Sequence, residues 1–460
     1  MHSWTSTRFV VLLAVVVMVG AACGNGEAET TTTAAPTTEA PQDTAETPDT
    51  TAADESTPDT TADETASLSY DLVIGDLVSL TGAENVFGPS FQAAAELAKG
   101  EIEAAVEEAG LDISISLEHA DDETTPQGAV AAARRLVASG ADCIAGPLTS
   151  GATLAVGEAV TAPEGIPNIA VAATSIAITD MEDDGMVFRL LPSDELQGPA
   201  LASVIAEDFG GAEDVTLSLA ARNDAFGEGF ITNFQAAWES IGGSTTGDPV
   251  LYDPEAASAD SEAQAIVAGE PDAFVVIDFP ASYARMGAAL LRTGEFDGSM
   301  LYVAGGQPAT IPEDVPFDSM NNARGTRPGV PEDSEALEAF FDLYDSTPDN
   351  PPIETFAQNN FDATMLCFLA SVAAGSDDSR AIAEALPVVS APPGTEYTWL
   401  ELGDAVSALA AGEDIDYQGV SGAIDFDDNG DPASGIYDIY EYQEGEQTKV
   451  GQIDTATLGN

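Results

Sequence analysis

The chain alternates apolar strand patterns with amphipathic helix patterns over most of its length, and this alternation constrains the fold more than any other feature. The first strand pattern covers residues 70–75. The helix pattern behind it starts at Gly88-Pro89-Ser90, where proline occupies a position that helix starts favour. Strands that alternate with helices form parallel sheets with helices on both faces. The sequence therefore predicts an α/β fold of doubly wound parallel sheets.

Two successive units of this kind predict two lobes with a cleft between them. In the first unit, strands are expected at residues 113–117, 143–145 and 168–171 and helices at 91–105, 129–137 and 152–160. The pattern restarts after Pro192, with strands expected at residues 215–219, 249–252, 273–277 and 300–303 and helices at 199–209, 229–241, 263–267 and 282–292. Ligands of open α/β sheets bind beyond the carboxyl ends of the strands, so the loops after the strands are the expected site.

The N-terminus has the composition of a secretory signal. Arg8 precedes an apolar run over residues 9–19, which is shorter than the helix of about 20 residues that spans a bilayer. Small residues then lead to Cys23, an arrangement that resembles a bacterial lipoprotein signal with a lipidated cysteine. We predict a signal peptide over residues 1–22, a lipid on Cys23, and a disordered tether over residues 23–67, rich in Thr, Pro and acidic residues. The protein would then be anchored to the outer face of the cell membrane, and ordinary secretion is the alternative.

The net charge of −68, from 80 acidic and 12 basic side chains, restricts the possible partners. Such a surface repels phosphate backbones, so nucleic acid is excluded as a partner. Self-repulsion of this size weakens as salt shortens the Debye length, so we expect the melting temperature to rise between low and molar NaCl. Hydrophobic residues make up 44% of the chain, which is enough for packed cores.

The remaining cysteines lie in apolar surroundings, Cys143 in a predicted strand and Cys367 in the run Leu366-Cys367-Phe368-Leu369. Both are typical of small buried hydrophobic residues. A disulfide between them is the alternative, but the sequence does not say whether their Cα atoms come within about 7 Å of each other. No metal-ligand spacing occurs, so neither a metal nor a cofactor is expected.

Two loops have the composition of a carboxylate site. The strand at 143–145 is followed by Gly146-Pro147-Leu148-Thr149-Ser150, and the strand at 168–171 is followed by Ala172-Ala173-Thr174-Ser175, each opening a helix. Free N–H groups at a helix start attract a carboxylate, and Ser150 adds a hydroxyl. Ser and Thr at a helix start are also common as caps alone, so both interpretations stay open.

Short motifs occur in a fixed order along the chain. They are Ser79-Leu80-Thr81-Gly82, Phe87-Gly88, Asp121-Asp122 with Pro126, Gly146-Pro147-Leu148-Thr149-Ser150, Ala172-Ala173-Thr174, Asp194 with Gln197-Gly198, and Phe226-Gly227-Glu228-Gly229. This series resembles the Leu/Ile/Val-binding family of type I periplasmic solute-binding proteins, and residues 422–431 are similar to that family's late hairpin. The resemblance covers nearly all of residues 70–455.

The resemblance implies a monomeric, lipid-tethered receptor that closes on a small ligand and delivers it to an ABC permease. It implies two lobes joined by a three-strand hinge. The N-terminal lobe would comprise residues 70–191 and 324–437, and the C-terminal lobe residues 192–323 and 438–455. No catalytic residue and no cofactor are implied.

The ligand contacts follow from the same resemblance. Ser150 would give its hydroxyl and backbone N–H to the ligand carboxylate, and Thr174 would contact both carboxylate and ammonium. The Ala172 carbonyl would accept from the ammonium. The other candidate contacts are Leu148, Thr149, Ala173 and the aromatic positions Phe87 and Phe226.

The chain departs from the family where the ligand ammonium is bound. The acidic residue expected from the second lobe would fall near Gly305-Gly306-Gln307, which contains no carboxylate. Asp194 or Asp278 would have to replace it, because an unpaired buried cation is costly. We expect a small apolar or neutral amino acid if one of these acids reaches the cleft. Otherwise we expect a carboxylate without an amine, or a neutral amide.

Three other interpretations compete with this one. Asp425, Asp427, Asn429 and Gly430 match the opening of a calcium loop, but Ile436 stands where glutamate is needed, which favours an Asn-Gly turn. His119 with Asp121 or Asp122 and Ser150 would be a hydrolase site, whereas the alternative is that the acidic pair and His119 line the rim of the cleft or cap a turn. A ligand-sensing receptor subunit for an amide or carboxylic acid is the third.

Overall fold

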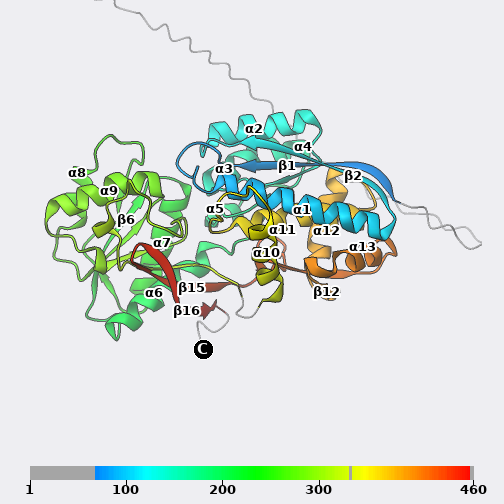
Figure 1. Cartoon of the computed structure of the whole chain (residues 1–460). Helices are drawn as coiled ribbons and strands as arrows, with labels where there is room; N and C mark the ends of the chain where they lie inside the picture. Colours follow the sequence, from blue (N-terminus) through cyan, green and yellow to red (C-terminus); the bar gives the residue numbers. More distant parts are fainter. Residues whose placement is uncertain (1–67, 331–333, 456–460) are drawn as a thin grey trace, which may run out of the picture. The chain divides into compact units, whose positions relative to one another are not determined.

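The structure is a computed structural model that describes residues 68–330 and 334–455 (Figure 1). The predicted signal peptide, Cys23 and the tether to residue 67 lie outside the described residues. Within the described part of the chain, no helix has both the length and the apolar character needed to cross a membrane.

The first sheet has the strand order β2-β1-β3-β4-β5, and all of its neighbours are parallel. This order is one of the two common in doubly wound folds. The edge strand β2 buries alternate residues, whereas β3 and β4 are buried throughout because helices cover both faces. The strands are β1 (Ser69–Val78), β2 (Asp112–Asp121), β3 (Cys143–Ala145), β4 (Asn168–Ala170) and β5 (Val187–Arg189).

Helices from two distant parts of the sequence cover the first sheet (Figure 1). One face packs on α1 (Gly88–Ala109) and α11 (Ala357–Ala374), and alanine is the commonest residue in the buried stripe of α1. The other face packs on α2 (Pro126–Ser139) and α3 (Ser150–Val156). Shorter helices continue this region: a π-helix η1 (Gly157–Thr161), α4 (Ala162–Glu164) and α5 (Ile176–Thr179).

The second sheet has the order β16-β15-β11-β10-β9-β6-β7, with β8 also paired to β6. Its central neighbours are parallel, as predicted, but β15 is antiparallel to both β11 and β16, so this sheet is mixed rather than wholly parallel. The strands are β6 (Thr216–Arg222), β7 (Ser244–Thr245), β8 (Val250–Tyr252), β9 (Ala273–Ile277), β10 (Leu301–Val303), β11 (Arg324–Pro328), β15 (Ile436–Gln443) and β16 (Glu446–Asp454).

Four helices cover the second sheet. One face packs on α6 (Asp194–Phe209) and α7 (Ala225–Ser240) through a cluster with Phe230, Phe234 and Trp238. The other face packs on α8 (Asp260–Ile266) and α9 (Pro280–Thr293). Two 3-10 turns, η2 (Gly298–Met300) and η3 (Phe317–Ser319), lie on either side of β10 in the sequence.

The chain passes between the two sheet regions three times, between β5 and α6, between β11 and α10, and between β14 and β15, which agrees with a three-strand hinge. Strand β11 pairs within the second sheet, and the lobe boundaries stay predictions. The segment between the last two passages joins the core of the first sheet. Its elements are α10 (Glu335–Ser346), α11, α12 (Ser379–Val389), β12 (Thr395–Tyr397), η4 (Trp399–Glu401), α13 (Leu402–Ala410), β13 (Ile415–Gly419) and β14 (Gly422–Ala423), of which the three strands form a small sheet.

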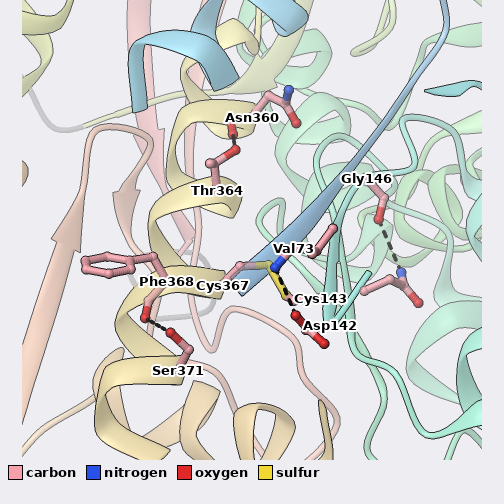
Figure 2. Close-up of a disulfide and its surroundings, with 10 residues drawn as sticks. Val73, Asp142, Cys143, Gly146, Asn360, Thr364, Cys367, Phe368 and Ser371 are labelled. Atoms are coloured by element: carbon pink, nitrogen blue, oxygen red, sulfur yellow. Dashed lines mark hydrogen bonds between the residues drawn. A yellow bond between two sulfur atoms is a disulfide. The ribbon is translucent and has the colours of Figure 1, made fainter. Parts of the chain in front are cut away.

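A disulfide joins Cys143 in β3 to Cys367 in α11 (Figure 2). Both cysteines are buried, as predicted, but the expectation that they are unpaired is wrong. Their Cα atoms lie 5.8 Å apart although 224 positions separate them in sequence. The chain returns to the first region after β11 and there places α11 against β3, a contact for which the local sequence pattern contains no signal.

Candidate functional site

A cavity of about 480 Å³, partly open to solvent, lies among loops of both sheets. The loops after β1, β3 and β4 supply one part of the wall, and the second sheet and its helices supply another. The lining residues are Glu84, Phe87, Leu148, Thr149, Ser150, Ala172, Thr174, Leu191, Gln197, Phe226, Phe279, Gly305, Gly306, Pro328 and Phe356.

Ser150 is more than a helix cap. The cap of α3 is Thr149, whose hydroxyl accepts from the Ala152 N–H at 3.4 Å. The Ser150 Oγ instead accepts from the backbone N–H groups of Thr174 and Ser175, at 3.3 and 3.2 Å. Since these bonds use the acceptor capacity of Ser150, its O–H remains available to donate into the cavity.

Thr174 places a second hydroxyl beside it. Its Oγ1 is buried and has no hydrogen-bond partner among the described residues, whereas its carbonyl accepts from the Asp194 N–H at 2.8 Å. A buried hydroxyl without a partner is costly unless a ligand completes it. Gly146 lets the loop before Ser150 run close to β1: its φ is 114°, and a Cβ there would come within 2.1 Å of the Leu77 carbonyl oxygen.

Phenylalanine rings form the opposite wall. Phe226 and Phe279 stack with ring centroids 5.3 Å apart and an angle of 11° between their planes. The Arg222 guanidinium lies 3.8 Å from the centroid of Phe279, a cation–π contact that holds this ring. Gly306 adjoins the stack with φ 92°, and a Cβ there would meet Phe279 at 3.1 Å. Phe356 lines the cavity as well.

Glu84 also lines the cavity and was not predicted from the sequence. It is only 2% exposed, and its Oε1 has no hydrogen-bond partner in the described residues. Burial raises the pKa of Glu84 well above its ordinary value, and the Arg222 charge opposes that rise. Glu84 lies between the motifs that begin at Ser79 and Phe87, and this position in the sequence is what could have identified it as a cavity residue.

Comparison with known proteins agrees with this geometry. Residues 71–447 match the family described as periplasmic binding protein. The chain belongs to this family.

Relatives support the same assignment. This periplasmic binding protein is 29% identical over 349 residues to "Leu/Ile/Val-binding protein homolog 3" of Brucella melitensis, covering 74% of this chain and 91% of the relative. It is 26% identical to the "chemotactic signal transduction system substrate-binding protein BasB" of Halobacterium salinarum, covering 69% of this chain and 74% of the relative. The predicted resemblance to the Leu/Ile/Val-binding family is confirmed.

Solved structures show the same fold. The leucine-binding protein LivK of Thermotoga maritima has a TM-score of 0.66 at 19% identity, covering 84% of this chain and all of that one. A solute-binding protein of R. palustris in complex with benzoate has a TM-score of 0.65 at 18% identity, covering 83% of this chain and 96% of that one. The predicted two-lobe fold is confirmed, and the periplasmic binding protein is an extracytoplasmic solute-binding protein.

The predicted loop residues come together in this binding protein, but the two predicted acids do not line the cavity. Ser150, Thr174, Ala172, Leu148, Thr149, Phe87 and Phe226 all line it, whereas Ala173, Asp194 and Asp278 lie behind its wall. Asp194 is fully buried beneath Thr174, and burial raises its pKa to about 7, against the opposing effects of the Thr174 side chain and the Arg189 charge. The Thr174 hydroxyl and the Asp194 carboxyl group are not in hydrogen-bonding geometry with each other.

Asp278 supports the aromatic wall from behind. Its Oδ1 accepts from the Phe279 N–H at 2.8 Å and from the Ser282 hydroxyl, and it lies 3.7 Å from an Arg222 nitrogen. Burial raises the pKa of Asp278 to about 6, and the Arg222 charge opposes the rise. Gln307, where the family acid was expected, donates to the Asp278 carbonyl at 2.5 Å.

The hydrolase arrangement is not assembled. His119 Nδ1 lies 2.6 Å from Asp76, and Nε2 lies 2.9 Å from Glu96, so both ring nitrogens have partners other than Ser150. Hydrogen bonding to Asp76 raises the pKa of His119 to about 9, so the ring is protonated at neutral pH and is no general base. Asp121 and Asp122 hold turns, as the competing interpretation proposed.

The calcium-like sequence forms a turn. Asp427 Oδ1 accepts from the N–H groups of Asn429 and Asp431, at 2.8 and 3.1 Å. Asp431 is bridged to the buried Arg189 at 2.5 Å. An antiparallel bridge between Phe426 and Pro432 closes the turn, in agreement with the Asn-Gly turn.

Proposed function

We propose that this protein is a lipid-anchored receptor that captures a small carboxylate-bearing ligand and delivers it to an ABC permease. Family membership supports capture of a small solute as its role. The observation that carries the carboxylate is the pair of buried hydroxyls of Ser150 and Thr174, both able to donate into the cavity.

Hydroxyl donors suit a carboxylate because hydrogen bonds to a charged acceptor are stronger than those between neutral groups. The stacked rings of Phe226 and Phe279, with Phe87, give the rest of the ligand an apolar surface. No lysine or arginine of the described residues lines the cavity, so a second anionic group on the ligand would be unpaired. The ligand class that fits is a small monocarboxylate with an apolar body.

Ser150→Ala and Thr174→Ala test this proposal. Each should weaken binding by about 1–3 kcal/mol, because a desolvated carboxylate oxygen loses a donor. The measurement is titration calorimetry with leucine, isoleucine, valine, their 2-oxo acids and benzoate. Thr125→Ala is the matched control, since it removes a hydroxyl that caps α2 without lining the cavity. Wild-type affinity in both site variants would show that the hydroxyls serve the fold only.

A ligand-sensing subunit is the second candidate, because one relative, BasB, is named for a chemotactic signal transduction system. The binding site would be the same, and only the partner would differ. Uptake of labelled ligand in a strain that lacks this gene separates the two roles. Loss of uptake supports delivery to a permease, whereas unchanged uptake with altered behaviour toward the ligand supports sensing.

A further inference from the structure

Among the described residues, Glu84 alone brings a carboxyl group to the lining of this cavity. It lines the cavity at 2% exposure, and its Oε1 makes no hydrogen bond to any described residue. Buried carboxyl groups are normally paired or hydrogen-bonded. A bound ligand is the remaining source of a partner for this atom.

The loop that carries Glu84 is fixed in place. The backbone N–H of Glu84 donates to the Thr124 hydroxyl at 3.1 Å, and the Glu84 carbonyl accepts from the Phe87 N–H at 3.0 Å. Asp121 accepts from the N–H groups of Leu80 and Thr81, at 3.0 and 3.1 Å. Such a loop holds the carboxyl group at the cavity rather than letting it turn to water.

Negative groups outnumber positive groups around Glu84. Arg222 is the positive group that acts on it, but Arg222 is already bridged to Asp224 at 2.5 Å and to Asp278 at 3.7 Å. Asp122, Asp224 and Asp278 add negative charge from other elements. A ligand with a positive group would relieve this excess, and a ligand with only a carboxylate would add to it.

We propose that Glu84 is the specificity-determining residue of this site and receives an ammonium group of the ligand. The carboxyl group thus comes from the loop after β1, not from the second sheet, where the family position holds Gly305-Gly306-Gln307. This inference rests on the proposed function, because Ser150 and Thr174 would hold the other end of the same ligand. It narrows the ligand from a monocarboxylate to a zwitterion with an apolar body, and it excludes benzoates and 2-oxo acids as preferred ligands.

Matched ligands that differ only in the amine provide the test. Calorimetry compares L-leucine with 4-methyl-2-oxopentanoate, and L-phenylalanine with phenylpyruvate, on the mature protein. In Glu84→Gln, the tighter-binding amino acid should lose about 10- to 100-fold in affinity, the usual worth of a charged hydrogen bond, while its oxo acid changes far less. Glu228→Gln removes the same charge from an exposed position of α7 and should change neither ligand.

Proton release gives a second measurement on the wild-type protein, which needs no variant to fold. Burial raises the pKa of unpaired Glu84, and an arriving ammonium would lower it, so amino-acid binding should release protons at pH values where unpaired Glu84 still carries one, and should strengthen as pH rises through that range. Calorimetry in buffers of different ionisation enthalpy measures this release. Tighter binding of the oxo acids, or equal loss of both ligand types in Glu84→Gln, would overturn the inference.

The two proposals fail differently. If the oxo acids bind tightest and Ser150→Ala weakens them, the carboxylate site stands and the role of Glu84 is wrong. If Ser150→Ala and Thr174→Ala change no ligand, the proposed function itself is wrong.

Discussion

The two parts of the cavity wall differ in chemistry. The loops after β1, β3 and β4 of the first sheet bring Glu84, Ser150 and Thr174, whose polar atoms are buried and not fully paired by the protein. The second sheet and its helices bring the stacked Phe226 and Phe279 and the backbone of Gly305 and Gly306. We call the first set the polar wall and the second the aromatic wall.

The two walls therefore recognise different properties of the ligand, namely its charged groups and the size and shape of its apolar body. The polar wall selects charged ends, because unpaired buried donors and acceptors are costly until a ligand matches them. The aromatic wall contributes apolar area and shape, and its own charges are paired behind the rings through Arg222 and Asp278. Changes in the polar wall should therefore alter which ligand binds, and changes in the aromatic wall should alter how tightly an apolar body binds.

Asp194 gives the largest expected effect, because it is buried directly behind the polar wall. Its pKa of about 7 lies above the ordinary value, so the folded state keeps a proton that the unfolded state has lost between about pH 4 and pH 7. The unfolding free energy should fall as pH rises through this window, by an amount on the order of 4 kcal/mol. Asp194→Asn should flatten this part of the profile, as measured by urea unfolding at several pH values.

The other buried acids limit how the Asp194 result is interpreted. Asp278, with a pKa of about 6, contributes in the same direction, so the comparison is between the wild-type and variant profiles, not with a flat line. If the unfolding free energy depends on pH with the same slope in the wild type and in Asp194→Asn, Asp194 is ionised in the folded state. A buried negative charge would then lie directly behind the polar wall.

The disulfide is the next largest effect and belongs to the first region alone, among the described residues. Replacing Cys143 and Cys367 together by alanine should lower the unfolding free energy by about 2–4 kcal/mol, since the cross-link restricts the unfolded chain. Thermal unfolding of the variant and of the reduced wild type measures it. Equal melting temperatures with and without reductant would contradict the bond.

The sequence predicted the polar wall better than the aromatic wall. Ser150 and Thr174 follow buried strands directly, and the carboxyl ends of neighbouring parallel strands meet at one edge of the sheet. Phe279 also follows a predicted strand, but a ligand ammonium needs a carboxylate, and this favoured the neighbouring Asp278 in the sequence. Phe279 lines the cavity and Asp278 does not, because the Asp278 side chain points toward Arg222 behind the wall. The sequence contains no signal for the pairing of Asp278 with Arg222.

Other features depended on contacts between distant segments. Up to Val303, the predicted helices and strands are present with shifted ends, but the strands β5 and β7 and the short helix α5 were not predicted. Glu84 was missed because its burial depends on the loop after β2, which folds against it through Thr124. The disulfide likewise depends on α11 meeting β3.

One set of titrations tests directly whether the polar wall binds the charged group and the aromatic wall binds the apolar body of the ligand. The tightest-binding carboxylate and its primary amide are titrated into the wild type, Ser150→Ala and Phe279→Leu. We predict that Ser150→Ala weakens the carboxylate by about tenfold or more but leaves the amide nearly unchanged, because the amide has already lost the charged acceptor. Phe279→Leu should weaken both ligands equally, by the smaller amount expected of a lost ring contact. Equal loss of carboxylate and amide in Ser150→Ala would contradict the account.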